Sequence, residues 1–219
     1  MAQKEETKII SIVGVDCCEV AYFMGRLLAV SDLPVLVVDN SRENSLFGSL
    51  WKTDSRDIVY RNITFTENIA YVPGVFDSFA YIVVYHGIEV IQEWWYASHS
   101  RIVVTDFDKY HSSALADSLK KLDKVNLSLI FKDRYSTKIK DMDLVKTLGL
   151  DMNKILYSFE FPVSEEDKAR QIEFQYNGVQ RLNTMSKGYI NVIENIYMNA
   201  TGQDKKTKFQ KLVAAADNL

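Results

Sequence analysis

The 219-residue sequence is poor in the residues that characterise several classes of protein. It has two cysteines, three prolines and nine glycines, which excludes collagen-like, linker-dominated and low-complexity chains. Its apolar runs fall short of the ~18 residues needed to cross a bilayer. The cysteines are the neighbours Cys17 and Cys18, which provide neither a disulfide framework nor a zinc-ligand spacing. We therefore expect a protein of the reducing cytoplasm.

The charge of the chain is nearly balanced. It has 26 lysines and arginines against 29 aspartates and glutamates, a formal net charge of −3, and this gives no electrostatic signature of nucleic-acid binding. The histidines His86, His99 and His111 lack the spacing of metal motifs, so we predict no metal site. The length and an apolar content of 47% suit one globular domain over residues 1–219.

Short β-branched apolar runs alternate with segments of helical period along the whole chain. The predicted strands are 8–15, 35–38, 68–72, 80–85, 101–105, 125–131 and 154–161. The predicted helices are 20–28, 46–51, 88–97, 112–122, 142–148, 165–176, 185–198 and 205–216, so that the C-terminal helices cover about 184–217. Strands separated by helices predict an α/β fold with a doubly wound, mostly parallel sheet and helices on both faces.

In such a sheet, ligands bind beyond the carboxyl ends of the strands. The segments to consider are therefore the ones that follow the predicted strands. They are 14–19, 39–43, 86–87, 106–108 and 132–134.

The first strand-to-helix turn lacks the residues of a P-loop. In the pattern G-x-x-x-x-G-K-[ST], glycines turn backbone N–H groups onto phosphates, the lysine reaches the β/γ-phosphates and the hydroxyl holds Mg²⁺. Counted from Gly14, the three last positions hold Glu19, Val20 and Ala21. Instead, Asp16 and Glu19 have the spacing of a capping box, so we expect their carboxylates to take the helix N–H groups that a phosphate would use.

Several segments nevertheless resemble the ParA/MinD-type P-loop ATPases. The residues 35–50, VLVVDNSRENSLFGSL, are similar to the strand that ends in Asp and the Ser-Leu pair that opens the next helix in that family. The segments 8–15, 71–74, 76–85 and RIVVTDFD at 101–108 resemble further strands of the family in the same order. The resemblance covers most of the chain and implies the P-loop NTPase-like three-layer fold, a homodimer and a role in positioning larger assemblies.

The resemblance also implies which residues remain of a nucleotide site. Asp39 matches the acid that helps to position the attacking water and the metal shell, although a strand-terminal Asp equally often caps the next turn. Gly14 and Asp16 are the other candidates for a remnant cofactor site. Tyr85 stands where the Walker B acid is expected. With the P-loop lysine and hydroxyl also missing, we expect no catalytic residue and no required cofactor; weak ATP or ADP binding is left open.

Two further segments suggest interactions. Trp94, Trp95 and Tyr96 are consecutive on a predicted helix, so at least one should lie near the surface and is a candidate interface residue; core burial is the alternative for one or two of them. The segment 204–213 carries four lysines beside an apolar stripe that includes Phe209 and Val213. Such a helix either contacts an anionic membrane or partner or, more commonly, packs its stripe on the domain.

These observations favour a non-catalytic, cytoplasmic ParA/MinD-like pseudo-ATPase that acts as a protein-interaction or scaffold component. Its assembly would be a partition, positioning, pilus or secretion complex, the last two through the TadZ/CpaE-like branch. One alternative is a nucleotide-dependent ATPase switch with an unorthodox site. The other is a small-molecule or thiol-based enzyme that uses Cys17, Cys18 or His86, although a lone histidine after a strand more often has a structural role.

Overall fold

A single eight-stranded sheet organises the chain. The structure is a computed structural model that describes residues 6–50, 57–203 and 208–219. The strands are β1 (Lys8–Gly14), β2 (Val35–Asp39), β3 (Asp57–Tyr60), β4 (Ile63–Glu67), β5 (Tyr81–Tyr85), β6 (Ser100–Thr105), β7 (Leu127–Phe131) and β8 (Ile155–Glu160). Their order is β3-β4-β2-β5-β1-β6-β7-β8, and only the β3–β4 pair is antiparallel. The predicted doubly wound, mostly parallel sheet is confirmed.

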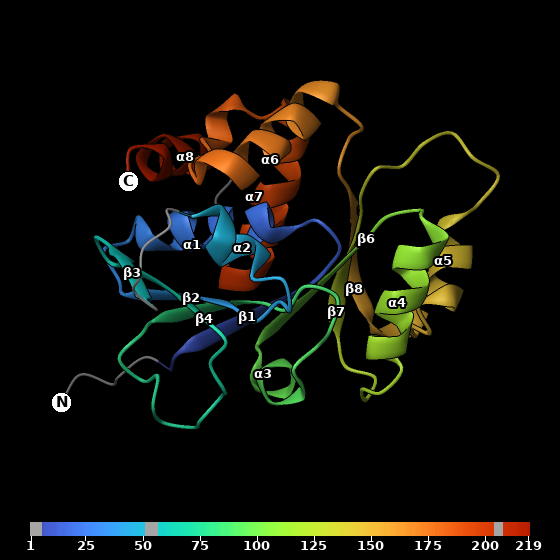
Figure 1. The fold of residues 1–219 in the computed structure, drawn as a ribbon, viewed down its shortest axis with the longest axis horizontal. Coiled ribbons are helices and arrows are strands. Elements are labelled where there is room, and N and C mark those ends of the chain that lie inside the picture. The colour runs from blue at the N-terminus through green and yellow to red at the C-terminus, as the bar shows by residue number, and fades with distance from the viewer. Residues whose placement is uncertain (1–5, 51–56, 204–207) are drawn as a thin grey trace.

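Helices cover both faces of this sheet, as Figure 1 shows. On one face lie α1 (Cys18–Ala29), α2 (Ser45–Ser49), α6 (Glu165–Asn177), α7 (Lys187–Thr201) and α8 (Phe209–Asp217). On the other lie α3 (Gln92–Ala97), α4 (Lys109–Leu119) and α5 (Asp141–Thr147). Two short 3-10 turns, η1 (Met152–Lys154) and η2 (Leu182–Thr184), complete the described elements.

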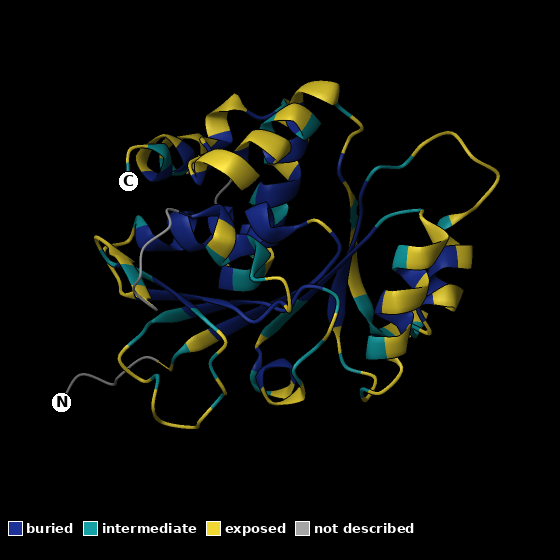
Figure 2. Ribbon diagram, in the orientation of Figure 1, coloured by how far each residue is buried: buried dark blue, intermediate teal, exposed yellow. Residues whose placement is uncertain are grey.

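The alternation of side chains along β1 explains the two-faced core. Ile10 and Ile12 pack in the cluster that contains α1, α7 and α8, whereas Ile9 and Val13 pack in clusters on the opposite face. Because both faces of the central strands are covered, those strands are continuous apolar runs. Figure 2 shows them as a buried layer between the helices.

The sequence prediction was wrong at the edge of the sheet. The residues 68–72 form a loop, and the strands β3 and β4 before it form an antiparallel hairpin. The hairpin turn is held in place because the Asn62 side-chain amide donates to the carbonyls of Ala29 and Leu33, at 2.7 and 2.8 Å. Helix α3 is also shorter than predicted, and Trp51, expected in the helix after β2, lies outside the described residues.

The C-terminal helix packs its apolar stripe on the domain. Phe209, Val213 and Ala216 are buried in the cluster that contains α1 and α7. This confirms the packing alternative and corrects the suggestion of membrane contact, because the stripe is already covered; Lys205 and Lys206 lie outside the described residues. Within the described ranges, none of the helices has the length and apolarity of a membrane span.

Candidate functional site

The turn between β1 and α1 is short and closely packed. Only Val15, Asp16 and Cys17 separate the strand from the helix, so the helix begins inside the span that a P-loop needs for its loop. Gly14 has a packing reason for being glycine, because a Cβ there would lie 2.2 Å from the carbonyl oxygen of Val104. Asp16 is exposed and takes a left-handed conformation, with φ of 45°.

A buried ion pair lies directly behind this turn. The carboxylate of Glu19, in the first turn of α1, lies 3.6 Å from Nζ of Lys132, and the two side chains are 3% and 4% exposed. The hydroxyl of Tyr189, on α7, donates to the same Glu19 oxygen at 3.2 Å. Lys132 directly follows β7, so three distant parts of the chain meet at the start of α1.

Lys132 also holds the backbone of the turn. Its Nζ donates to the carbonyl oxygen of Asp16. Burial acts to lower the pKa of Lys132, but the negative charge of Glu19, with smaller contributions that include Asp133 and Asp16, raises it above its ordinary value. The ammonium group is therefore charged, and its charge is directed at the chain's own acids.

The predicted capping box is wrong. Cys17, and not Asp16, is the residue before the helix, and no side chain caps it. The Glu19 carboxylate turns inward to Lys132 and Tyr189 instead of reaching back to the turn. The reason is that an unpaired ammonium buried at the end of β7 would be strongly destabilising without a counter-charge.

Asp39 serves as a cap. It is 1% exposed, and its Oδ1 accepts from the backbone N–H and the hydroxyl of Ser41 at 2.9 and 2.6 Å. Its Oδ2 accepts from the N–H of Phe47, in α2, at 2.7 Å. Burial raises the pKa of Asp39, and the hydrogen bonds to Ser41 and Phe47 act to lower it. Both carboxylate oxygens are thus engaged within the chain.

Tyr85, at the Walker B position, is in the core. It is buried in the cluster of α1, and burial raises the pKa of its hydroxyl, with the hydrogen bond to Ser45 opposing the rise. A neutral phenol in the core supplies no charge for a metal ion.

The two cysteines are free and buried. Burial, and next the negative charge of Glu19, raise the pKa of both Cys17 and Cys18 well above the ordinary value of a thiol. Since the thiolate is the reactive form, these residues pack as apolar groups, which argues against the thiol-based enzyme.

His86 and Ser11 form a hydrogen-bonded pair that is not a catalytic dyad. His86 Nδ1 accepts from the N–H of Ile91 at 3.2 Å, so the ring proton is on Nε2, which lies 2.9 Å from Ser11 Oγ. Ser11 in turn donates to Ser98, whose hydroxyl donates to the Trp94 carbonyl at 2.8 Å. A donor Nε2 cannot take the serine proton. Burial lowers the pKa of His86 to about 3, which agrees with the structural role expected for it.

The neighbouring loop after β6 carries a second histidine. His111 Nδ1 lies 2.6 Å from the Asp106 carboxylate, and this hydrogen bond raises the pKa of His111. Asp108 caps α4 by accepting from the N–H groups of Tyr110 and His111. Asp106 and Asp108 are thus engaged by His111 and by the start of α4. Among the residues that the structure describes, no group of three metal-ligating side chains is present.

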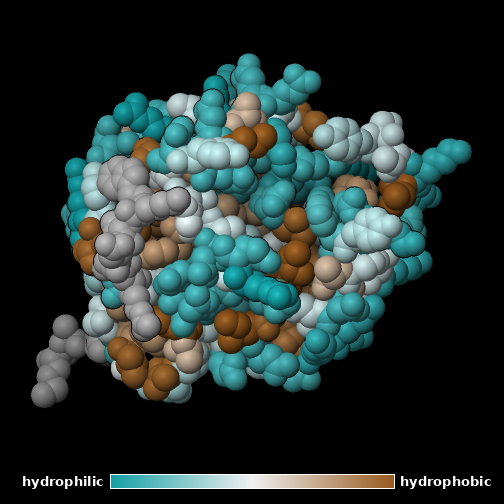
Figure 3. Space-filling view, viewed as in Figure 1, coloured by the Kyte–Doolittle hydropathy of each residue, from teal (hydrophilic) through white to brown (hydrophobic). Residues whose placement is uncertain are grey.

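The aromatic cluster is mostly internal. Trp94 and Trp95 are buried, and Trp94 donates its indole N–H to the carbonyl of Ile69 at 2.9 Å. The prediction that they form an interface is wrong for these two, because helix α3 turns both toward the sheet. Tyr96 is 41% exposed and accepts from the N–H of Asp123, so its role at an interface stays a prediction. On the face seen in Figure 3, hydrophobic residues form several separate groups among hydrophilic ones.

The sequence matches no known family profile and no curated protein. Its fold is similar to a chain of the MinC:MinD cell division protein complex of Aquifex aeolicus, with 15% identity over 92% of this chain and 98% of that one and a TM-score of 0.62. A ParA family ATPase from Chlorobium tepidum is similar over 87% and 98%, with 14% identity and a TM-score of 0.59. A putative plasmid partition protein from Borrelia burgdorferi, solved with AMPPNP, is similar over 90% and 98%, with 17% identity and a TM-score of 0.56. The fold is therefore ParA/MinD-like.

Proposed function

We propose that this protein is a non-catalytic, cytoplasmic ParA/MinD-like pseudo-ATPase that acts as a scaffold or interaction component of a positioning, partition, pilus or secretion assembly. The observation that carries the proposal is the buried pair of Glu19 and Lys132. An ATPase of this fold uses a lysine at the start of the first helix to bind phosphate. Here the lysine at this place directly follows β7, and its charge is neutralised by a carboxylate of that same first helix.

Nucleotide binding would have to overcome two costs. A phosphate at the turn would compete with Glu19 and the Asp16 carbonyl for the Lys132 ammonium. It would also approach the exposed carboxylate of Asp16 in the turn, and like charges repel. The proposal is therefore that no nucleotide cofactor is required. We further propose that the protein forms a homodimer without ATP and that it is related to the TadZ/CpaE-like branch of the family.

Calorimetric titration with ATP, ADP and GTP, each with Mg²⁺, tests the absence of a nucleotide site. We expect no heat of binding at micromolar concentrations from any of the three. Micromolar binding of any of the three would overturn the proposal, and its loss in Lys132→Met, once thermal unfolding shows that this variant is folded, would support the unorthodox switch. The matched control is Lys168→Gln, which removes a half-exposed lysine paired with Asp133 and should leave the titration unchanged.

Sedimentation velocity over a range of protein concentrations tests self-association. We expect a dimer in the absence of nucleotide, and a monomer at every concentration would contradict this part of the proposal. Tyr96→Ala tests whether Tyr96, the exposed residue of the aromatic cluster, contributes to this dimer. Tyr157→Ala is its control, because Tyr157 is a similarly exposed tyrosine on β8.

A further inference from the structure

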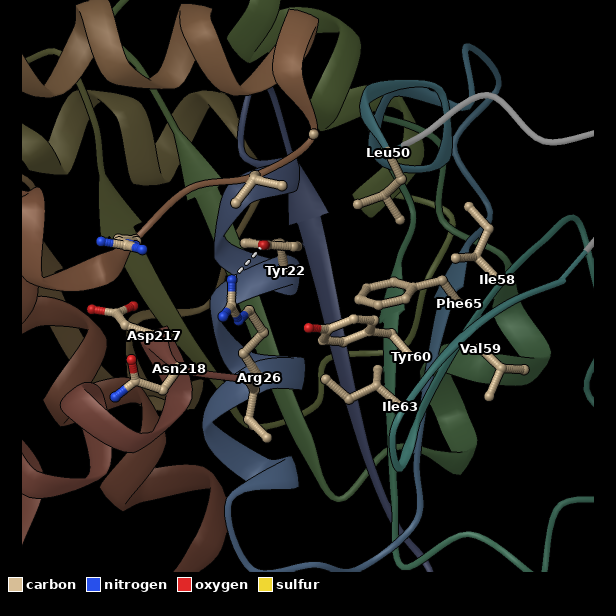
Figure 4. Close-up of a pocket in the computed structure, with 14 residues that line it drawn as sticks. Tyr22, Arg26, Leu50, Ile58, Val59, Tyr60, Ile63, Phe65, Asp217 and Asn218 are labelled. Atoms are coloured by element: carbon tan, nitrogen blue, oxygen red, sulfur yellow. Dashed lines mark hydrogen bonds between the residues drawn. The ribbon is translucent and has the colours of Figure 1, made fainter.

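A cavity of about 510 Å³ lies between α1, the β3–β4 hairpin and the C-terminal end of α8. In Figure 4, Tyr22 and Arg26 lie in the middle of the view, with Asp217 and Asn218 to their left and Tyr60 and Phe65 to their right. Cavities of this size commonly hold small organic ligands. It shares no residue with the turn after β1, so it is distinct from the site considered above.

Arg26 is the unusual residue of this cavity. Arg26 is only 9% exposed. No carboxylate among the described residues is within ion-pair distance of its guanidinium. Its partners are neutral oxygens: the hydroxyl of Tyr22 at 2.6 Å, the carbonyl of Ala216 at 2.6 and 3.0 Å, and the carbonyl of Gln180 at 3.4 Å. A buried cation without a counter-charge is costly, and this is a reason to look for a bound anion.

The guanidinium retains one donor for such an anion. Of its five N–H groups, Nε, one on Nη2 and both on Nη1 point to the acceptors above, which leaves the second N–H of Nη2 without a partner among the described residues. The nearby acid Asp217 also lines the cavity but is not within ion-pair distance of Arg26, and its two oxygens accept from the N–H groups of Leu182 and Asn183. Arg181 and Asp217 both line the cavity and carry charges of opposite sign.

The opposite wall is apolar and aromatic. Ile63 and Phe65 project from β4, and Leu50 follows α2. Tyr60, at the end of β3, is 44% exposed and borders the opening. One end of the cavity thus holds the Arg26 guanidinium, and the other end provides a surface for a flat or branched apolar group.

We propose that this cavity binds a small amphipathic organic acid, with its carboxylate on the free N–H of Arg26 and its aromatic or alkyl body against Tyr60, Ile63 and Phe65. The bound carboxylate would provide the direct ion-pair partner that Arg26 lacks among the described residues. Burial of the apolar body removes both its surface and that of the wall from water. The proposal does not depend on whether a nucleotide binds elsewhere.

The test uses 4-phenylbutyrate as a probe and its neutral amide as a matched compound. Binding to the full-length protein is followed by calorimetry and by ¹H–¹⁵N NMR chemical-shift changes. We expect the acid to bind about tenfold more tightly than the amide, the ratio typical of one charge-assisted hydrogen bond. The shifts should be largest in β3, β4, α1 and α8. Equal affinities, no binding at millimolar probe, or shifts elsewhere would each overturn the proposal.

Variants separate the two ends of the cavity. Arg26→Gln should abolish the preference for the acid; because Arg26 also holds the carbonyl of Ala216, thermal unfolding must show that this variant is folded. Tyr60→Ala removes an exposed ring and should weaken both probes about equally without unfolding the chain. Tyr157→Ala, an exposed tyrosine on β8 at the other edge of the sheet, is the matched control and should change neither affinity. If Tyr60→Ala has no more effect than this control, the apolar half of the proposal is wrong.

Discussion

Lys132, at the end of β7, and Glu19, in the first turn of α1, form a buried ion pair with 3.6 Å between Nζ and Oε1. The pair joins the sheet to the first helix at the place where a P-loop ATPase binds phosphate. Tyr189 from α7 completes the group by donating to the same carboxylate oxygen. The C-terminal helices are thereby connected to the first turn of the fold.

Removing both partners of this pair should destabilise the chain by less than the sum of the two single losses. Glu19→Gln or Lys132→Met alone leaves a polar or charged group buried without its partner, and we expect a loss of about 3–5 kcal/mol in the free energy of unfolding. The double variant should recover about 1–3 kcal/mol of the summed loss. Urea denaturation of the four proteins measures the cycle.

The half-exposed pair of Lys168 and Asp133 is the control for this cycle. Its atoms are also 3.6 Å apart, but an exposed pair contributes only about 0–1 kcal/mol. If Lys168→Gln costs as much as Lys132→Met, burial is not the reason for the effect.

A second prediction concerns Gly14, where the resemblance implies a remnant of the nucleotide site and the structure shows close packing. Gly14→Ala places a Cβ 2.2 Å from the Val104 carbonyl oxygen, and we expect a loss of about 2–3 kcal/mol from overpacking. Gly48→Ala is the control, because nothing lies within 4 Å of a Cβ at this helical glycine. That substitution should be neutral or stabilise by up to about 1 kcal/mol. Thermal and urea unfolding provide both values; equal losses would contradict the packing argument.

The fold was predictable because its central strands are buried on both faces. Runs such as 35–38 have no polar side, and only a covered parallel sheet explains several of them in one chain. The hairpin was missed for the opposite reason. The strand β3 is short and mostly exposed, so neither its length nor its pattern distinguishes it from a loop.

Of the candidate site, only the missing P-loop residues could be predicted from the sequence. The absence of the P-loop residues is a local property of the sequence, whereas the partner of Glu19 is set by tertiary packing. One signal was present in the sequence. Lys132 directly follows a five-residue buried strand, and it therefore lies at the carboxyl ends of the parallel strands, where ligands bind. A lysine in that place needs an anion, either from a ligand or from the chain, and periodicity alone cannot say which.

His86 should make the protein less stable in acid. Its pKa is 6.5 when unperturbed and about 3 in the folded chain, so the unfolded state binds the extra proton between these values. The contribution of neutral His86 is complete above pH 6.5 and is lost as the pH falls toward 3. Between pH 6.5 and 5 this amounts to about 2 kcal/mol. Urea denaturation at both pH values measures the loss.

His86→Gln isolates this effect, because the amide keeps one donor and one acceptor but does not titrate. The variant should lose about 2 kcal/mol less than the wild-type protein over the same interval. His111 contributes with the opposite sign, since Asp106 raises its pKa in the folded chain, and this contribution is common to both proteins. An unchanged pH dependence in the variant would show that another group is responsible.

The thiols should be inert in the folded protein. Cys17 and Cys18 are buried, and burial raises the pKa of each, so almost no thiolate is available at neutral pH. With Ellman's reagent we expect no rapid colour from the native chain and the full yield of both thiols in denaturing urea. In the absence of urea, the thiols should react with the reagent only slowly, at a rate set by how often the chain unfolds. Reaction of either thiol within seconds in the native state would support the alternative of a thiol-based enzyme. It would also show that the turn between β1 and α1 opens.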